Sequence, residues 1–424
     1  MRFLYNDFTM DNRRSIAVID MKAFYAYVEC VDRGLDPWKA PLIVADKERG
    51  KNTIILSVSP YLKSKGVPSR LRVRDLPPGF DYIYATPRME RYIERSSEVV
   101  NIMLEFVSEE DIHVYSIDEA FIDLTSYLSY YKKSAYELTK EIIETIKRKT
   151  ELQATGGIGD NFFLAKVALD IFAKHEKDGI AMMHIEDVKT KLWPITPLTE
   201  IWGIGERTAA KLNRIGIYSV GDLANANRDY FKAKFGIMGE QLIDHANGID
   251  EADIHEEYIP NETSLSIGQT LHEDYTKKGA EYLLKEMNDD LSAKLRGQKQ
   301  TTALISVTVM YSANQGGFSR QMSLLRPTND TKELYDAIIE LYHKHIGNLP
   351  IRGLHISYGK LRDIKDYEQL NIFLSPEVEE KRKALNEMID LIHNRYGKNV
   401  IIRANSLLEG TAIERHSQIG GHRK

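Results

Sequence analysis

The chain has 424 residues, a formal net charge of −5 and a single cysteine. One hydrophobic core rarely serves more than about 250–300 residues, so several domains are expected. The negative charge excludes a protein that coats nucleic acid by bulk electrostatics, although an enzyme could still concentrate its basic residues locally. Cys30 cannot form an intramolecular disulfide and is expected to be a packing residue. With no apolar run of about 18 residues and no secretion signal over 1–11, we expect a cytoplasmic protein without a membrane span.

Residues 13–31 are predicted to form a strand followed by a helix. The strand is the apolar run Ile16–Ile19, and Asp20 stands between it and the helix. Asp20 is either the cap of that helix or a metal ligand at the end of a strand. Two short apolar runs come next, at 41–45 and 53–58, separated by a charged turn at 46–52. The stretch 61–74 then carries five lysines and arginines and no acid, typical of either a solvated face or a phosphate-binding surface.

Two adjacent carboxylates, Asp118 and Glu119, follow a predicted helix over 88–107 and lie between two short apolar stretches. Side chains alternate between the faces of a strand, and a buried carboxylate requires a compensating charge. The residues alone leave two alternatives. The pair belongs to a solvated hairpin, or it joins Asp20 in a site for divalent cations.

Alternating strands and helices continue to residue 174. An amphipathic helix is predicted over 135–147, and residues 155–174 are predicted to form a strand, a Gly-Gly-Ile-Gly turn at 156–159 and a helix that ends at Lys174. Lys174 is either an ordinary cation at a helix C-terminus or a phosphate contact. The alternation predicts a mixed α/β domain with an inserted basic subdomain and the acids in the cleft between them.

A change of composition past Trp193 introduces a glycine hairpin at 201–217. Gly203 and Gly205 precede the helix that begins near Glu206, and a second glycine turn follows it. Backbone amides at such a turn can hold a phosphate, as in the helix-hairpin-helix element that grips DNA backbone, and a plain helical turn is the alternative.

The last third of the chain follows an acidic linker at 251–263. Strands are predicted at 264–271, 302–311, 318–325 and 351–361, with helices at 276–296 and 331–346. These give a β-α-β-β-α-β order. In the second strand, the face of residues 303, 305, 307 and 309 is apolar and the 306/308 face is polar and free to meet a partner. Beyond it lie the peptide Gln369–Phe373, which either folds back or docks into a partner, and a charged helix at 377–396.

Four motifs in this order resemble the Y-family translesion DNA polymerases, closest to the branch of polymerase IV and the polymerase V catalytic subunit in a Gram-positive or plasmid-borne form. They are Ile19-Asp20-Met21-Lys22-Ala23-Phe24-Tyr25, Tyr115-Ser116-Ile117-Asp118-Glu119-Ala120, Gly157-Ile158-Gly159 through Ala165-Lys166 to Ala173-Lys174, and Gly203-Ile204-Gly205. The likeness covers about residues 13–362, and its Ser-Ile-Asp-Glu-Ala element is highly specific.

The resemblance implies a multidomain α/β protein. Its parts would be an α+β palm (1–22 and 91–180), fingers (23–90), a helical thumb with the helix-hairpin-helix (181–250), the linker (251–263), a βαββαβ little finger that binds DNA (264–362) and a C-terminal tail (363–424). The implied activity is template-directed, low-fidelity DNA synthesis at damaged template in DNA repair and the SOS response. Asp20, Asp118, Glu119 and the carbonyl of Met21 would bind two Mg²⁺ ions.

The resemblance also assigns roles to residues around the metals. Tyr25 would be the steric gate against a ribose 2′-hydroxyl, and the deoxynucleoside triphosphate would contact Phe24, Ser57, Lys63 and Lys174. Many members have Tyr and Arg where this chain has Pro60 and Lys63, so the triphosphate grip is expected to differ. Primer-template DNA would contact Gly203, Gly205 and Lys211. Gln369, Leu370, Ile372 and Phe373 would bind the bacterial sliding clamp.

We expect the protein to work as a monomer. Two other functions remain as alternatives. One is a catalytically silent accessory protein that binds DNA and the clamp, and the other is a palm-domain nucleotidyl cyclase with the same two-metal chemistry. The three carboxylates argue against the first, and the thumb-like hairpin and βαββαβ module argue against the second.

Overall fold

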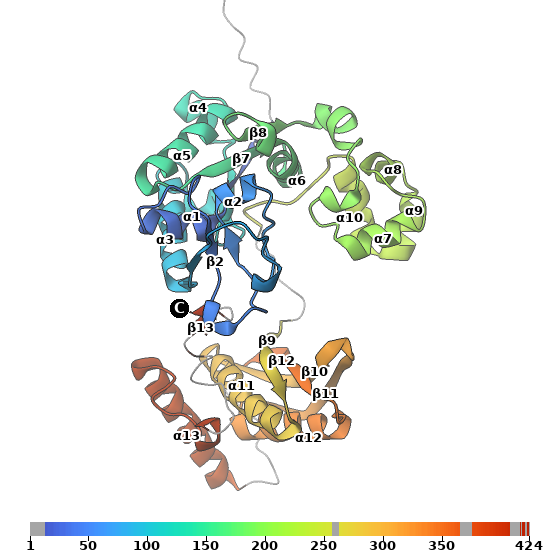
Figure 1. Ribbon diagram of the computed structural model, residues 1–424. Helices are drawn as coiled ribbons and strands as arrows, with labels where there is room; N and C mark the ends of the chain where they lie inside the picture. The colour runs from blue at the N-terminus through green and yellow to red at the C-terminus, as the bar shows by residue number, and fades with distance from the viewer. Residues whose placement is uncertain are drawn as a thin grey trace, which may run out of the picture. The chain divides into compact units, whose positions relative to one another are not determined.

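The chain divides into two compact units, Met1–Glu257 and Tyr258–Lys424. The computed structural model describes residues 13–256, 263–364, 375–407, 416, 418–419 and 422–423 (Figure 1). The division falls within the acidic stretch 251–263. No helix of the described residues is long and apolar enough to cross a membrane.

A five-stranded sheet organises the first unit. Its strand order is β5-β6-β1-β7-β8, so the first strand of the chain lies at the centre. The strands are β1 (Ile16–Met21), β5 (Ile112–Val114), β6 (Glu119–Asp123), β7 (Ala154–Gly159) and β8 (Ile180–Met183). Strand β1 is antiparallel to both β6 and β7.

Successive side chains of β1 enter two different cores, as the period of a strand requires. Ala17, Ile19 and Met21 pack with one set of helices, whereas Ile16 and Val18 pack with another. The first core is built by α1 (Phe24–Asp32), α3 (Met89–Met103), α4 (Tyr127–Tyr131) and α5 (Ala135–Thr150). Cys30 of α1 lies in this core without exposure, as predicted.

The second core begins with α6 (Phe162–Val167), which continues through a π-helical turn, Ala168–Phe172. Side chains of four further helices also pack in this second core, and Figure 1 shows these helices gathered in one cluster. These are α7 (Glu206–Asn213), α8 (Val220–Ala224), α9 (Arg228–Phe235) and α10 (Ile237–Ala246).

The prediction of a glycine turn at 156–159 was wrong, because these residues form most of β7. Close packing explains the glycines. A Cβ on Gly157 would lie 2.2 Å from the carbonyl oxygen of Ala165, and one on Gly159 would lie 2.4 Å from the amide nitrogen of Ala165. The helix α6 therefore lies directly on the strand, and only residues without a side chain permit that distance.

A smaller sheet of order β3-β2-β4 accompanies α2 (Pro60–Ser64). Its strands are β2 (Leu42–Val44), β3 (Ser57–Val58) and β4 (Ile83–Ala85). Of the apolar run 53–58, only the last two residues form a strand, and Ile54 makes only an isolated bridge to Arg72. Apolar residues alone did not mark the break, because Ile55 is buried without strand pairing.

The second unit has the predicted β-α-β-β-α-β order, with sheet order β11-β10-β12-β9. Its main elements are β9 (Leu265–Tyr275), α11 (Lys277–Gly297), β10 (Gln300–Tyr311), β11 (Gly317–Thr328), α12 (Thr331–His345) and β12 (Ile351–Asp363). Ile305, Val307 and Val309 of β10 are buried as predicted. The register shifts between Thr302 and Leu304, so Thr302 rather than Ala303 is buried at the start of that face.

A further helix, α13 (Pro376–Tyr396), contacts this unit mainly through polar groups. Arg296 of α11 binds Asp390 through Nε (2.6 Å) and Nη2 (2.9 Å). The short strands β13 (Gln418–Ile419) and β14 (His422–Arg423) pair with each other. The predicted clamp-binding residues 369–373 lie outside the described residues.

Candidate active site

Asp20, Asp118 and Glu119 are brought together by the pairing of β1 with the β5–β6 hairpin. Asp20 and Glu119 are register partners on adjacent antiparallel strands. The amide of Met21 donates a hydrogen bond to the carbonyl of Asp118 at 2.9 Å. The Asp118 side chain accepts a hydrogen bond from Ser116 Oγ at 2.8 Å. Residues nearly a hundred positions apart in the chain therefore form one acidic cluster.

Burial and mutual repulsion raise the pKa values of two carboxylates in this cluster. The pKa of Asp20 is raised to about 7, first by burial and then by Asp118 and Glu119. Burial also raises the pKa of Glu119, although Lys166 acts in the opposite direction. A carboxylate with such neighbours gains most from a nearby cation.

Lys166 is the residue of this site that the sequence did not identify. Its ammonium on α6 is buried and lies 2.8 Å from each Glu119 oxygen and 3.2 Å from Asp170. The hydrogen bond is made to Oε2, while the buried Oε1 of Glu119 has no hydrogen bond of acceptable geometry. In the sequence, Lys166 is an ordinary lysine on a helix, and only the family motif Ala165-Lys166 offered a signal.

The donors of this cluster fit a divalent cation by their chemistry. Hard cations bind carboxylate and carbonyl oxygens, and Glu119 Oε1 is a buried oxygen that lacks a hydrogen bond. In the arrangement described, however, no three His, Cys, Asp or Glu side chains of the described residues converge as a ligand set. Lys166 and Ser116 hold Glu119 and Asp118, respectively.

Lys63 lies within reach of the charges of the acidic cluster and of Lys174. Burial and the charge of Lys174 lower the pKa of Lys63, whereas Asp20 and Asp118 act to raise it. Both lysines are exposed. Lys63 lies on α2, where Ser59 caps the helix and Pro60 occupies the first turn, a position that suits its fixed φ.

Tyr25 stands in the first turn of α1, beside the acids. Its side chain is half-buried, and its pKa is raised by burial and by Asp118. Ala23, just before the helix, has φ 48°, an uncommon backbone conformation for a residue with a side chain. The Oγ of Ser57 donates to the carbonyl of Ala23 at 3.3 Å. Phe24 is only 2% exposed, so its side chain belongs to the core and any nucleotide contact falls to its backbone.

The glycine hairpin at 203–205 lies before α7. Gly203 has φ 85°, which favours glycine, and Gly205 is the residue before the helix. A Cβ on either glycine would have no atom within 4 Å, so this backbone faces open space. Lys211, also on α7, is exposed. Just before these glycines, Trp202 donates from Nε1 to the Tyr115 hydroxyl at 3.2 Å, which links this hairpin to the one that carries Asp118.

The fold and this site define a multidomain α/β protein with a carboxylate cluster at the end of an antiparallel sheet and a separate helical module. Residues 19–170 match the impB/mucB/samB family, residues 186–217 match the IMS family HHH motif, and residues 262–372 match the impB/mucB/samB family C-terminal domain.

Similar proteins extend over the whole chain. It is 34% identical over 423 residues to the putative UV-damage repair protein UvrX of Bacillus subtilis strain 168, which covers 98% of this chain and 99% of the relative. It is 33% identical over 423 residues to DNA polymerase IV 2 of the same strain, covering 98% and 100%. A solved Y-family DNA polymerase chimera has the same fold, with a TM-score of 0.65, 20% identity and coverage of 82% of this chain and all of that one.

The chain therefore belongs to the impB/mucB/samB family, which is the Y family of DNA polymerases. This confirms the resemblance, the multidomain α/β fold and the helix-hairpin-helix predicted from the sequence. Divalent metal dependence is general in this family.

Proposed function

We propose that this protein is a template-directed DNA polymerase that adds deoxynucleotides to a primer opposite damaged template. The observation that supports it most is the acidic cluster itself. Asp20, Asp118 and Glu119 adjoin one another, and their repulsion with burial raises the pKa of Asp20 to about 7. Relatives named DNA polymerase IV and UV-damage repair protein support the substrate and the setting in repair.

In this proposal the carboxylates, with the carbonyl of Met21, hold two Mg²⁺ ions. When bound, the metals lower the pKa of the primer 3′-hydroxyl and neutralise charge on the triphosphate. Lys63 and Lys174 bind phosphate oxygens, since both are exposed and the charges of Asp20, Asp118 and Lys174 all act on Lys63. Tyr25 blocks the space of a ribose 2′-hydroxyl.

Lys166 balances the acids by its ion pair with Glu119. The amides at Gly203 and Gly205, with Lys211, hold the DNA backbone without reading its sequence.

The proposed subdomains follow the boundaries expected from the sequence. The five-stranded sheet, apart from the last three residues of β8, belongs to the palm (1–22 and 91–180), and the three-stranded sheet belongs to the fingers (23–90). Helices α7 to α10 belong to the thumb (181–250). Beyond the linker, the four-stranded sheet is the little finger (264–362), where Thr308 and Ser319 present hydroxyls 2.8 Å apart on the exposed side.

The partners in this proposal are primer-template DNA, deoxynucleoside triphosphates and, through residues 369–373, the bacterial sliding clamp. We also propose that a single copy of the chain suffices and that it works in the cytoplasm.

Primer extension on undamaged and abasic templates with Mg²⁺ tests the proposal. We expect extension by the wild type and at least about a 100-fold loss in Asp118→Asn and in Glu119→Gln, since each removes charge that the transition state requires. Glu144→Gln, an exposed acid on α5, is the matched control and should extend normally. A wild type that binds primer-template but never extends it, with or without clamp, would instead support a silent accessory protein.

A further inference from the structure

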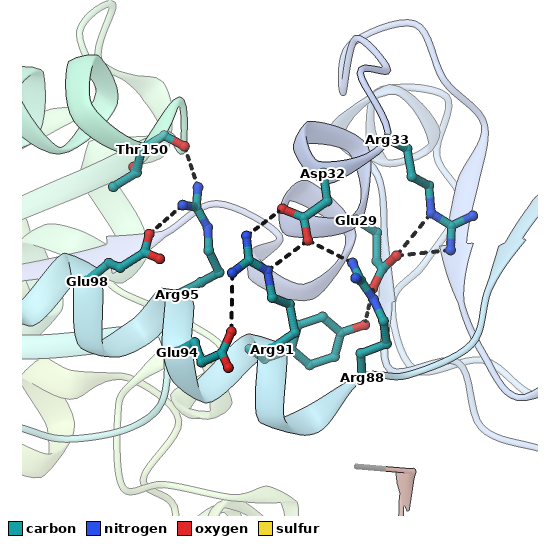
Figure 2. A network of polar contacts seen from close by, with 10 residues as sticks. Glu29, Asp32, Arg33, Arg88, Arg91, Glu94, Arg95, Glu98 and Thr150 are labelled. Atoms are coloured by element: carbon teal, nitrogen blue, oxygen red, sulfur yellow. Dashed lines mark hydrogen bonds and ion pairs between the residues drawn. The ribbon is translucent and has the colours of Figure 1, made fainter.

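Glu29 is a fully buried carboxylate that the proposed chemistry does not use. It lies on α1 with no side-chain exposure and accepts hydrogen bonds from Arg33 Nε (3.0 Å), Arg88 Nε (2.8 Å) and the hydroxyl of Tyr92 (2.9 Å). Figure 2 shows Arg33 and Arg88 converging on it. A buried carboxylate is costly unless every partner is in place, so this set of contacts holds a defined geometry.

The geometry leads to Tyr25. Tyr25 and Glu29 are four residues apart on α1 and therefore share a face of the helix. Tyr92, on α3, meets both of them. Its ring centroid is 4.7 Å from that of Tyr25, with the planes at 45°, while its hydroxyl binds Glu29. Tyr92 itself has no exposure.

We propose that Glu29 and Tyr92 are positioning residues that set how strongly the protein rejects ribonucleotides. The inference rests on the proposed role of Tyr25 as the steric gate. Glu29 fixes the hydroxyl of Tyr92, and the Tyr92 ring then supports the gate from the side of the core. Rejection of one hydroxyl group depends on placing the excluding ring to well within about 1 Å, so a gate without this support admits a ribose.

The remaining contacts hold the carboxylate in place. Arg88 is also bound by Asp32 at 2.8 Å, and Asp32 is bound in turn by Arg91 at 2.9 Å (Figure 2). The side chains of Arg33 and Arg88 are 38% and 42% exposed. Water can therefore solvate both arginines when Glu29 is replaced, whereas the Tyr92 hydroxyl has no such substitute.

The test compares single-nucleotide insertion of a deoxynucleotide and the matching ribonucleotide by the full chain, expressed as the ratio of their kcat/KM values. Tyr25→Ala should lower this ratio at least about 100-fold and establishes the gate. Tyr92→Phe and Glu29→Met should each lower it about five- to tenfold with less than about a twofold change for the deoxynucleotide. Glu29→Gln keeps an oxygen for Tyr92 and should retain most of the discrimination.

Tyr131→Phe is the matched control. It removes another tyrosine hydroxyl hydrogen bond of the same core, to the carbonyl of Phe106 at 2.9 Å. The Tyr131 ring packs on that of Phe106, with 6.3 Å between the centroids. Its ratio should equal that of the wild type, and the thermal midpoint of each variant shows whether it is folded.

Three outcomes would overturn the inference. If the ratio is unchanged in Tyr92→Phe and Glu29→Met but lowered in Tyr25→Ala, Tyr25 is the steric gate and Tyr92 and Glu29 do not support it. If Tyr131→Phe lowers the ratio by the same factor, the effect comes from general loosening of the core and not from the contact of Tyr92 with Tyr25. No change in Tyr25→Ala rejects the gate itself, and with it any support, while polymerase activity on deoxynucleotides still stands.

Discussion

At the scale of single residues, the charge state of Asp20 is the most distinctive property of the site. Its raised pKa means that the folded, metal-free chain binds a proton that the unfolded chain has already released near neutral pH. The contribution of Asp20 to stability is therefore complete below about pH 4 and is lost as the pH rises through about 7.

Asp20→Asn should stabilise the metal-free protein at pH 8 by about 4 kcal/mol, because it removes a buried charge beside two others. At pH 4 the variant and the wild type should unfold alike. Denaturant unfolding in EDTA measures both. Added Mg²⁺ should then stabilise the wild type and leave the variant nearly unchanged, and equal stabilisation of the two would contradict a metal role for Asp20.

Lys63 gives a second residue-scale prediction. Lys63→Ala should raise the KM for deoxynucleotides about tenfold, and Lys63→Arg should keep or lower it, because Arg offers a bidentate fork to phosphate. Steady-state insertion measures KM. Lys65→Ala, an exposed lysine at the end of the same helix, is the control and should match the wild type. A tenfold increase with Lys65→Ala would show only a general effect of charge.

At the scale of elements, the contact between β7 and α6 sets the position of Lys166 and so of Glu119. Gly157→Ala should destabilise the chain by about 3 kcal/mol, because the added Cβ meets backbone atoms at 2.2 and 2.4 Å. Gly205→Ala should change stability little, since its φ is −80° and its surroundings are open. Thermal unfolding compares the two, and equal stabilities would show that the strand can move away from the helix.

The sequence predicted elements well wherever one period of hydrophobicity ran unbroken, as in Ile16–Ile19 and in most of β10. It failed where a residue type has two physical uses. The glycines at 156–159 were interpreted as a turn, yet they serve close packing. The bulge after Thr302 shifted a face by one residue, which no alternation pattern records.

For the site, the sequence supplied the acids, because adjacent carboxylates in an apolar run require an explanation. It could not supply Lys166, whose partner Glu119 is 47 positions away, or the contact of Tyr92 with Glu29 across 63 positions. Pairings of that kind are made by tertiary packing. They leave no local pattern in the chain.

At the scale of the whole molecule, the proposed clamp contact should affect the length of synthesis and not its chemistry. Leu370→Ala with Phe373→Ala should abolish stimulation by the sliding clamp and leave clamp-free extension unchanged, because a peptide anchored on a clamp raises the effective concentration of enzyme at the primer. Product-length distributions with and without clamp measure this. Val378→Ala, an exposed apolar change on α13, is the control. Full stimulation of the double variant would exclude this peptide as the anchor.

The contact between Trp202 and Tyr115 has a consequence for the whole molecule. The two rings lie 6.0 Å apart between centroids and share a hydrogen bond, so the glycine hairpin and the Asp118 hairpin are joined within the same unit. In the proposed polymerase, DNA backbone gripped at the first hairpin is registered against the carboxylates at the second. The distance between the bound DNA backbone and the catalytic carboxylates is then set by the contact of Trp202 with Tyr115, and not by the shape of a damaged template.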